Sequence, residues 1–207
     1  MISFTDYLKK YELFSLSFKY IISENRGAYN PYHSTFHLLD VFQKCMEMST
    51  DYNLYEKDIL ELGVAALFHD FNHSGGKLKD YENIELAIRG FNDFYDKNID
   101  KFKSLEKGNI EELIKVTEYP HIREPNNIKE MILIDSDMIQ CYNKNWFLNV
   151  ITGFLMKEIG LSIEDAINNQ IRYIQGVHYY TEYANSIHTQ EKNKMLNNLN
   201  YFKNIYK

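Results

Sequence analysis

The stretch YEKDILELGVAALFHD, residues 55–70, decides the fold of this chain. From Ile59 to Phe68 its apolar residues cover most of the circumference of a helix instead of forming one stripe. A helix that is apolar nearly all round is buried. The apolar run is too short to cross a membrane. We therefore expect residues 55–70 to form a central helix surrounded by other helices.

Apolar residues recur with helical spacing along almost the whole chain. In addition to 55–70, the spacing predicts helices over residues 4–24, 34–50, 80–98, 109–118, 126–140, 145–158, 162–183 and 187–205. Pro31 is expected to mark a helix start, and Gly75-Gly76 a turn. Period-two alternation is essentially missing, so no significant sheet is expected. With no repeat or flexible linker, the sequence predicts an all-α fold, a single compact helical domain over residues 1–207.

The composition is that of an ordinary globular protein. Of 207 residues, 44% are hydrophobic and 25% charged, so the chain can bury a core without disulfides or structural metals. Cys45 and Cys141 form no ligand-type pair and are expected to be buried thiols in a reducing compartment. The net charge of −6 and the lack of a basic stripe argue against duplex nucleic acid as a partner. Neither a signal peptide nor a membrane span is recognised, so a cytoplasmic location and no membrane partner are expected.

Four of the seven histidines form two pairs with a spacing of four, His33/His37 and His69/His73. On a helix this spacing places both rings on one face. Asp70 follows His69 at the end of the buried helix, where a charged carboxylate is costly unless it is paired or bound to a cation. A histidine on an apolar helix is more often a hydrogen-bonded core residue than a ligand. Each pair alone is therefore a weak sign of metal binding, and the order of the motifs carries the argument.

The ordered motifs resemble the HD-domain superfamily of metal-dependent phosphohydrolases. YHSTFHLLDVF at 32–42 resembles the first histidine motif of cyclic-nucleotide phosphodiesterases, and ALFHDFNHSGG at 66–76 resembles their His-Asp motif. NIELA at 83–87, LIKVT at 113–117 and ILIDSDMI at 132–139 follow in family order. NQIRYIQGVHYYTEYA at 169–184 is closer to a bacterial branch of predicted HD phosphohydrolases. The resemblance covers about residues 28–200.

The resemblance implies a set of metal ligands, which are His37, His69, Asp70 and Asp137. Asp137 matches the ligand better than Asp135, because Asp137 precedes the apolar pair at 138–139. One or two divalent ions (Mn, Mg, Fe, Ni, Co or Zn) are implied, with Asp70 bridging to the second.

The resemblance also implies catalytic roles. His73 would lie beside the second metal or its water, and His33 matches the general acid of the phosphodiesterases. The expected reaction is hydrolysis of a small phosphoester by metal-activated hydroxide, and the expected substrate is a nucleotide or cyclic-nucleotide phosphodiester.

Gln170 and Tyr173 have the spacing of the glutamine and aromatic residue that hold the purine in phosphodiesterases. Ordinary helix positions explain them equally well. Lys77, after the glycine turn, is a further candidate for substrate contact.

The chain departs from the phosphodiesterase pattern in two places. Ser34 replaces an asparagine, and the family's downstream Glu with paired histidines has no match; His121 could partly substitute. These departures bear on cyclic-nucleotide specificity more than on metal hydrolysis.

Two other functional classes remain open. An HD-fold di-iron oxygenase would use the same ligands, and a non-catalytic nucleotide or metal sensor could keep the fold. The retained His33 argues against a sensor, which has no need of a general acid.

Overall fold

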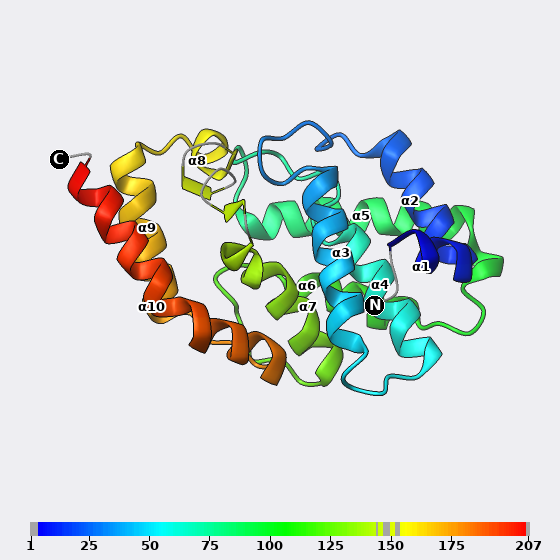
Figure 1. Cartoon of the computed structure of the whole chain (residues 1–207). Helices are drawn as coiled ribbons and strands as arrows, with labels where there is room; N and C mark the ends of the chain where they lie inside the picture. Colours follow the sequence, from blue (N-terminus) through cyan, green and yellow to red (C-terminus); the bar gives the residue numbers. More distant parts are fainter. Residues whose placement is uncertain (1–3, 144, 147–149, 152–153, 206–207) are drawn as a thin grey trace.

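A computed structural model describes residues 4–143, 145–146, 150–151 and 154–205 (Figure 1). The described part of the chain is all-α and contains no β-strand, as the sequence predicts. Its α-helices are α1 (Phe4–Lys10), α2 (Glu12–Glu24), α3 (Thr35–Ser49), α4 (Glu56–Phe68), α5 (Asp80–Lys97), α6 (Lys107–Lys115), α7 (Ile128–Met138), α8 (Phe154–Ile159), α9 (Ile163–Gly176) and α10 (Glu182–Ile205). Short 3-10 turns follow α5 (Ile99–Lys101) and α7 (Ile139–Tyr142).

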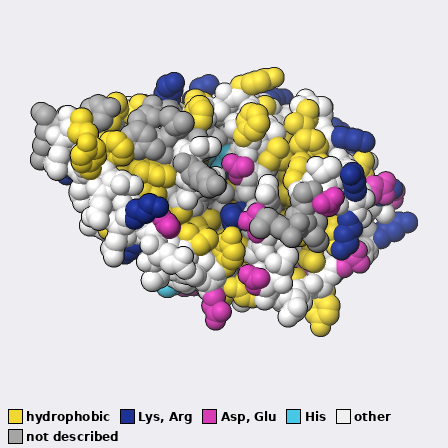
Figure 2. Space-filling model, in the orientation of Figure 1, with side chains coloured by type: hydrophobic (Ala, Val, Ile, Leu, Met, Phe, Trp, Pro, Cys, Tyr) yellow, Lys and Arg dark blue, Asp and Glu magenta, His cyan; other side chains and the backbone are white. Residues whose placement is uncertain are grey.

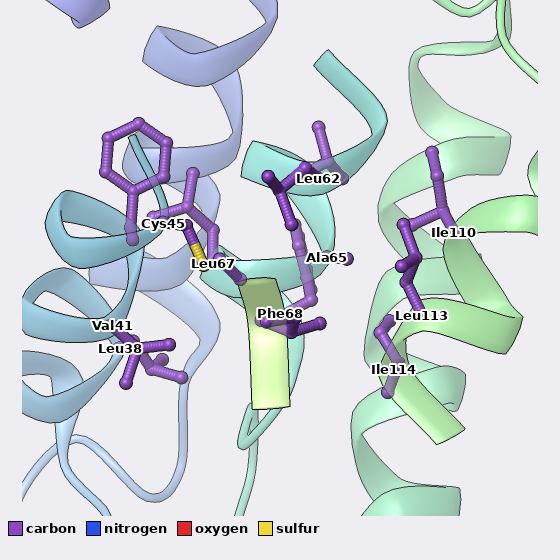
Figure 3. Close-up of a cluster of buried hydrophobic side chains, with 14 of the residues drawn as sticks. Leu38, Val41, Cys45, Leu62, Ala65, Leu67, Phe68, Ile110, Leu113 and Ile114 are labelled. Carbon is purple, nitrogen blue, oxygen red and sulfur yellow. The ribbon is translucent and has the colours of Figure 1, made fainter. Parts of the chain in front are cut away.

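Helix α4 lies at the centre, as its apolar circumference predicts. It contacts α2, α3, α5, α6 and α7, and every residue from Glu61 to Phe68 is buried. Figure 3 shows its side chains, among them Leu62 and Phe68, between those of α3 on one side and α6 on the other. Each large apolar side chain buried in this way contributes about 1.5–3 kcal/mol to folding.

Helices α9 and α10 build a second, smaller apolar cluster. They pack side by side at the left of Figure 1, on the opposite side of the molecule from α1 and α2. The buried members of the cluster are Val150, Ile151, Ile167, Ile174, Met195 and Leu199. The expectation that residues 1–207 form one domain stays a prediction.

The prediction of one continuous helix over residues 4–24 is wrong, because the helix is broken at Tyr11. Tyr11 has an extended backbone (φ −120°, ψ 109°) and separates α1 from α2. In one straight helix Phe4 and Phe14 would be about 15 Å apart along the axis. The break lets both rings contact Phe42, with centroid distances of 5.6 and 5.1 Å.

The helix predicted over 162–183 ends early, at Gly176, and α10 begins five residues before the predicted 187. The buried Asp135 explains the gap. Its carboxylate accepts hydrogen bonds from the backbone N–H groups of Tyr180 and Thr181, at 3.0 and 2.7 Å. This pairing with α7 replaces the hydrogen bonds that a continuous helix would make. Part of the helix predicted over 145–158 lies outside the described residues.

Charge distribution and helix apolarity were also expectations from the sequence. On the face in Figure 2, lysine and arginine side chains are scattered among acidic and uncharged ones. None of the described helices has the length and apolarity needed to cross a membrane.

Candidate metal centre

The predicted metal ligands come from α3, from the C-terminal end of α4 and from α7. His37 belongs to the first turn of α3, His69 is the C-cap residue of α4, and Asp70 follows it directly. Asp137 lies in the last turn of α7. Residues far apart in the sequence therefore converge because α3 and α7 pack against α4 and against each other.

The premise that each histidine pair shares one helix face is wrong. His33 lies two residues before the first residue of α3, and His73 lies in the turn after α4. Pro31 likewise precedes the start of α3 by four residues. The rings of His33 and His73 still approach each other, because the loop before α3 and the turn after α4 are adjacent. The His33 and His73 rings stack with centroids 3.9 Å apart.

The donor atoms of His37, His69, Asp70 and Asp137 form a tight cluster. His37 Nε2 is 3.2 Å from Asp70 Oδ2, 3.1 Å from Asp137 Oδ1 and 3.3 Å from His69 Nε2. His69 Nε2 is 3.3 Å from Asp70 Oδ2 and 3.8 Å from Asp137 Oδ1. Ligands about 2.1 Å from one metal ion are separated by about 3.0 Å in octahedral and about 3.4 Å in tetrahedral geometry. The cluster therefore has the size and the donor types of a divalent metal site.

The electrostatics of this cluster favour a cation between the rings. Burial alone would lower the pKa of His37, but hydrogen bonds with Asp137 and Asp70 raise it to about 10. Burial would raise the pKa of Asp70, but the charges of His69 and His33 hold it well below its ordinary value. Burial would also raise the pKa of Asp137, but the hydrogen bond and the charge of His37 lower it. The same negative field that holds a proton on His37 would attract a metal ion.

Hydrogen bonds fix the orientation of the ligands. His69 Nδ1 donates to the carbonyl oxygen of Ala66 at 2.8 Å, which leaves Nε2 free for a metal. Asp135 is excluded as a ligand by its bonds to the start of α10, so the structure brings together Asp137 and not Asp135, as the sequence indicates. Tyr173 and Tyr179 both donate to the carbonyl oxygen of Met138, at 2.7 and 3.3 Å. They anchor the backbone next to Asp137.

A second cluster beside the first combines His33, His73 and Glu158. The fully buried side chain of Glu158 pairs with His33 Nδ1. Its other oxygen accepts hydrogen bonds from the backbone N–H groups of Tyr32 and His33, at 2.8 and 3.0 Å. Either cluster could hold a metal ion. In the second cluster, His73 Nδ1 already accepts a hydrogen bond from the N–H of Gly75 at 3.1 Å. The His33 and His73 rings are stacked, so their nitrogens do not point at a common metal position. These contacts favour a cluster held together by hydrogen bonds over a second metal site.

Sequence reasoning missed Glu158 and Asn30, and it identified Gly76 only as part of a turn. Asn30 Nδ2 donates to the carbonyl oxygens of His73 and His33, at 2.6 and 3.2 Å, and so joins the two loops. Gly76 has φ +76°, and a Cβ there would lie 2.6 Å from the carbonyl oxygen of Glu158. The Gly75-Gly76 turn was the only feature of the sequence that pointed to this region, since neither Glu158 nor Asn30 is part of an apolar periodic pattern.

A cavity of about 360 Å³ opens onto both clusters, since Asp137 and His33 form part of its wall. Thr117, His121, Gln170 and Tyr173 also line it, so the structure gathers most of the predicted substrate contacts there. The side chain of Gln170 is buried, and its Nε2 has no hydrogen-bond partner. His121 Nε2 is 3.0 Å from Met138 Sδ.

Lys77 is not brought to the site. It is exposed in the loop after His73 and lines none of the cavities described here.

Comparisons of the chain with protein-family models, curated proteins and solved structures find no match. The family resemblance of the motifs therefore stays a prediction, and the function has to be argued from the site.

Proposed function

We propose that this protein is a metal-dependent phosphohydrolase of the HD type. One observation carries the proposal: a four-residue donor set of metal-site dimensions reaches, through Asp137, the cavity that the carboxylate-paired His33 also lines. The ordered resemblance of the motifs to the HD-domain superfamily supports the same conclusion.

Each side chain has a distinct task in the proposed reaction. A divalent ion held by His37, His69, Asp70 and Asp137 would supply Lewis acidity and lower the pKa of water. His33 donates a proton to the departing alkoxide, for which an imidazole is well suited at neutral pH. Glu158 accepts the Nδ1 proton of His33, so that Nε2 is the nitrogen that delivers a proton.

A nucleotide substrate fits the cavity wall. The unpartnered Nε2 of Gln170 can donate to the edge of a base, and burial without a partner is costly unless a ligand or water provides one. The hydroxyl of Tyr173 is committed to Met138, so its contribution is limited to the ring, which can stack on a base. This support is independent of the metal ligands.

The proposal is tested by combining metal analysis with a substrate panel. Protein loaded separately with Mn, Mg, Fe, Co, Ni and Zn is assayed on nucleoside monophosphates, cyclic nucleotides, dinucleotides and bis-p-nitrophenyl phosphate. We expect hydrolysis with at least one metal, and loss of both metal and activity in Asp70→Ala. Asp96→Asn, an exposed carboxylate of α5, is the matched control and should retain both.

Full metal occupancy in Asp70→Ala would contradict the ligand set. Oxygen consumption by the iron-loaded protein, without hydrolysis of any phosphoester, would favour the di-iron oxygenase. Metal binding without either activity would favour a sensor.

A further inference from the structure

The cavity at the metal centre continues into a second, larger one of about 630 Å³. The two cavities share six lining residues, which are Tyr119, His121, Met138, Leu155, Gln170 and Tyr173. Because the shared residues include both Gln170 and Tyr173, the proposed base site lies at the junction of the two cavities. The two cavities therefore adjoin as one groove, and we call the part at the metal centre the inner part and the other the outer part.

The inner part is small for a complete ligand site. Its volume of about 360 Å³ is near the lower end of the range for ligand pockets, about 300–1,000 Å³. A phosphate at the metal and a base at Gln170 would occupy it. A substrate of one nucleotide would leave the outer part unused, so the groove is suited to a longer molecule.

Arg172 supplies the charge of the outer part. It is the sole lysine or arginine among the described residues that line either cavity. Its Nη2 donates to the side-chain oxygen of Asn169, one turn earlier on α9, and this contact holds the guanidinium at the groove. Within the described residues Arg172 forms no ion pair, in contrast to Arg123, which pairs with Glu130. The guanidinium is therefore available to an anionic ligand.

We propose that the groove binds an elongated nucleotide that carries a second phosphate, outside the scissile ester, and that this phosphate pairs with Arg172. The inference rests on the proposed function and specifies its substrate class. A guanidinium can bind a phosphate through two parallel hydrogen bonds. The rings of Tyr119 and Tyr180, which also line the outer part, offer surfaces for a second base. A linear dinucleotide with a 5′-phosphate has these features.

The test compares the 5′-phosphorylated dinucleotide pApA with ApA, which lacks the terminal phosphate. Binding to the Mn-loaded His33→Ala variant is measured by titration calorimetry, so that hydrolysis does not consume the ligand. We expect pApA to bind about fivefold or more tightly than ApA, since a partly exposed ion pair contributes about that factor. The preference should shrink at high salt, where the exposed ion pair is screened.

Variants of Arg172 assign the preference to this residue. In the same background, Arg172→Gln should bind pApA and ApA equally, and Arg172→Lys should restore part of the preference. Arg89 is an exposed arginine of α5 that lines neither cavity, so Arg89→Gln is the matched control. This variant should keep the preference for pApA over ApA.

Two outcomes would overturn the inference. One is equal binding of pApA and ApA by the protein with Arg172 intact, and the other is a preference that survives Arg172→Gln. If neither dinucleotide binds, the substrate class is wrong, whereas the proposed function is judged separately by metal content and by the phosphoester panel.

Discussion

His33 and His37 are four residues apart, yet their surroundings give them different chemistry. His37 lies between Asp70 and Asp137, within 3.2 Å of both carboxylates, which suits a metal ligand. His33 faces a single carboxylate, that of Glu158, which suits a residue that transfers protons. Neither role can be read from the residue type. Two of the three partners, Asp137 of α7 and Glu158 of α8, lie 100 residues or more further along the chain, whereas Asp70 follows α4.

His33→Ala should lower kcat by a factor on the order of 10²–10⁴ while the metal content stays unchanged. The loss should be large for substrates with an alkoxide leaving group, which needs a proton, and small for p-nitrophenyl esters, which do not. Glu158→Gln should show the same dependence on the leaving group with a smaller loss, because it acts through His33. Rates on paired substrates and metal analysis measure these effects.

Thr50→Ala is a suitable control, because its exposed hydroxyl bonds only to the carbonyl of Glu47 at the end of α3. It should leave both rates unchanged. If His33→Ala slows good and poor leaving groups equally, His33 does not act as the general acid.

At the scale of elements, two helical glycines show how close packing sets helix positions. Gly90 is buried in α5, and a Cβ there would lie 2.1 Å from Cδ1 of the buried Phe71. Gly108 is in the first turn of α6, where a Cβ would have no neighbour within 4 Å. Phe71 follows Asp70 directly, so the absence of a side chain at Gly90 allows the turn after α4 to pack against α5.

Gly90→Ala should destabilise the fold by about 1–3 kcal/mol, because the methyl group overfills a packed region. Gly108→Ala should instead stabilise it by up to about 1 kcal/mol through helix propensity. The free energies of unfolding from urea titrations, at unchanged m, measure both changes. Equal stability of the two variants would show that the α5 contact with Phe71 is looser than the structure indicates.

The helices could be predicted because apolar periodicity is a local signal, as in the apolar circumference of residues 55–70 that indicates the central helix. The candidate metal ligands, with Asp137 preferred to Asp135, came instead from the resemblance of the ordered motifs to the HD-domain superfamily. The break at Tyr11 and the early end at Gly176 depend on Phe42 and Asp135, which are distant in sequence. Glu158 was missed for the same reason, since its partner His33 is 125 residues away. Periodicity describes the faces of one helix, not which helices cross.

At the scale of the whole molecule, the candidate metal centre joins the parts of the fold. His37, His69 and Asp137 tie α3, α4 and α7 together, and Tyr173 of α9 bonds to the backbone next to Asp137. The groove beside the candidate metal centre is accordingly formed between the main helical core and the α9–α10 pair. A metal ion bound only by the folded chain would stabilise this arrangement as a unit.

Removal of metal by a chelator should therefore lower the melting temperature. Metal at 100 times its Kd contributes about 2.7 kcal/mol, which for a chain of this size corresponds to about 5–10 °C. Scanning calorimetry of the loaded and chelated protein measures the difference. In Asp70→Ala the two forms should melt at the same temperature. A chelator that lowers the melting temperature of Asp70→Ala as much as that of the unaltered protein would place the metal elsewhere.

The difference in melting temperature between the loaded and the chelated protein should also depend on pH, and the charges around His37 determine the direction of the change. In the metal-free fold the pKa of His37 is about 10, raised above its ordinary value of 6.5 by Asp137 and Asp70 against the effect of burial. The stabilisation from a raised pKa is complete below about pH 6.5 and is lost as the pH rises toward 10. A metal ligand is a neutral imidazole, so the loaded protein does not suffer this loss. The gap in melting temperature should accordingly widen between about pH 6.5 and 8.5. Because His37→Ala removes the titrating group, its chelated form should show a flatter pH dependence, and an unchanged dependence would mean that another group titrates.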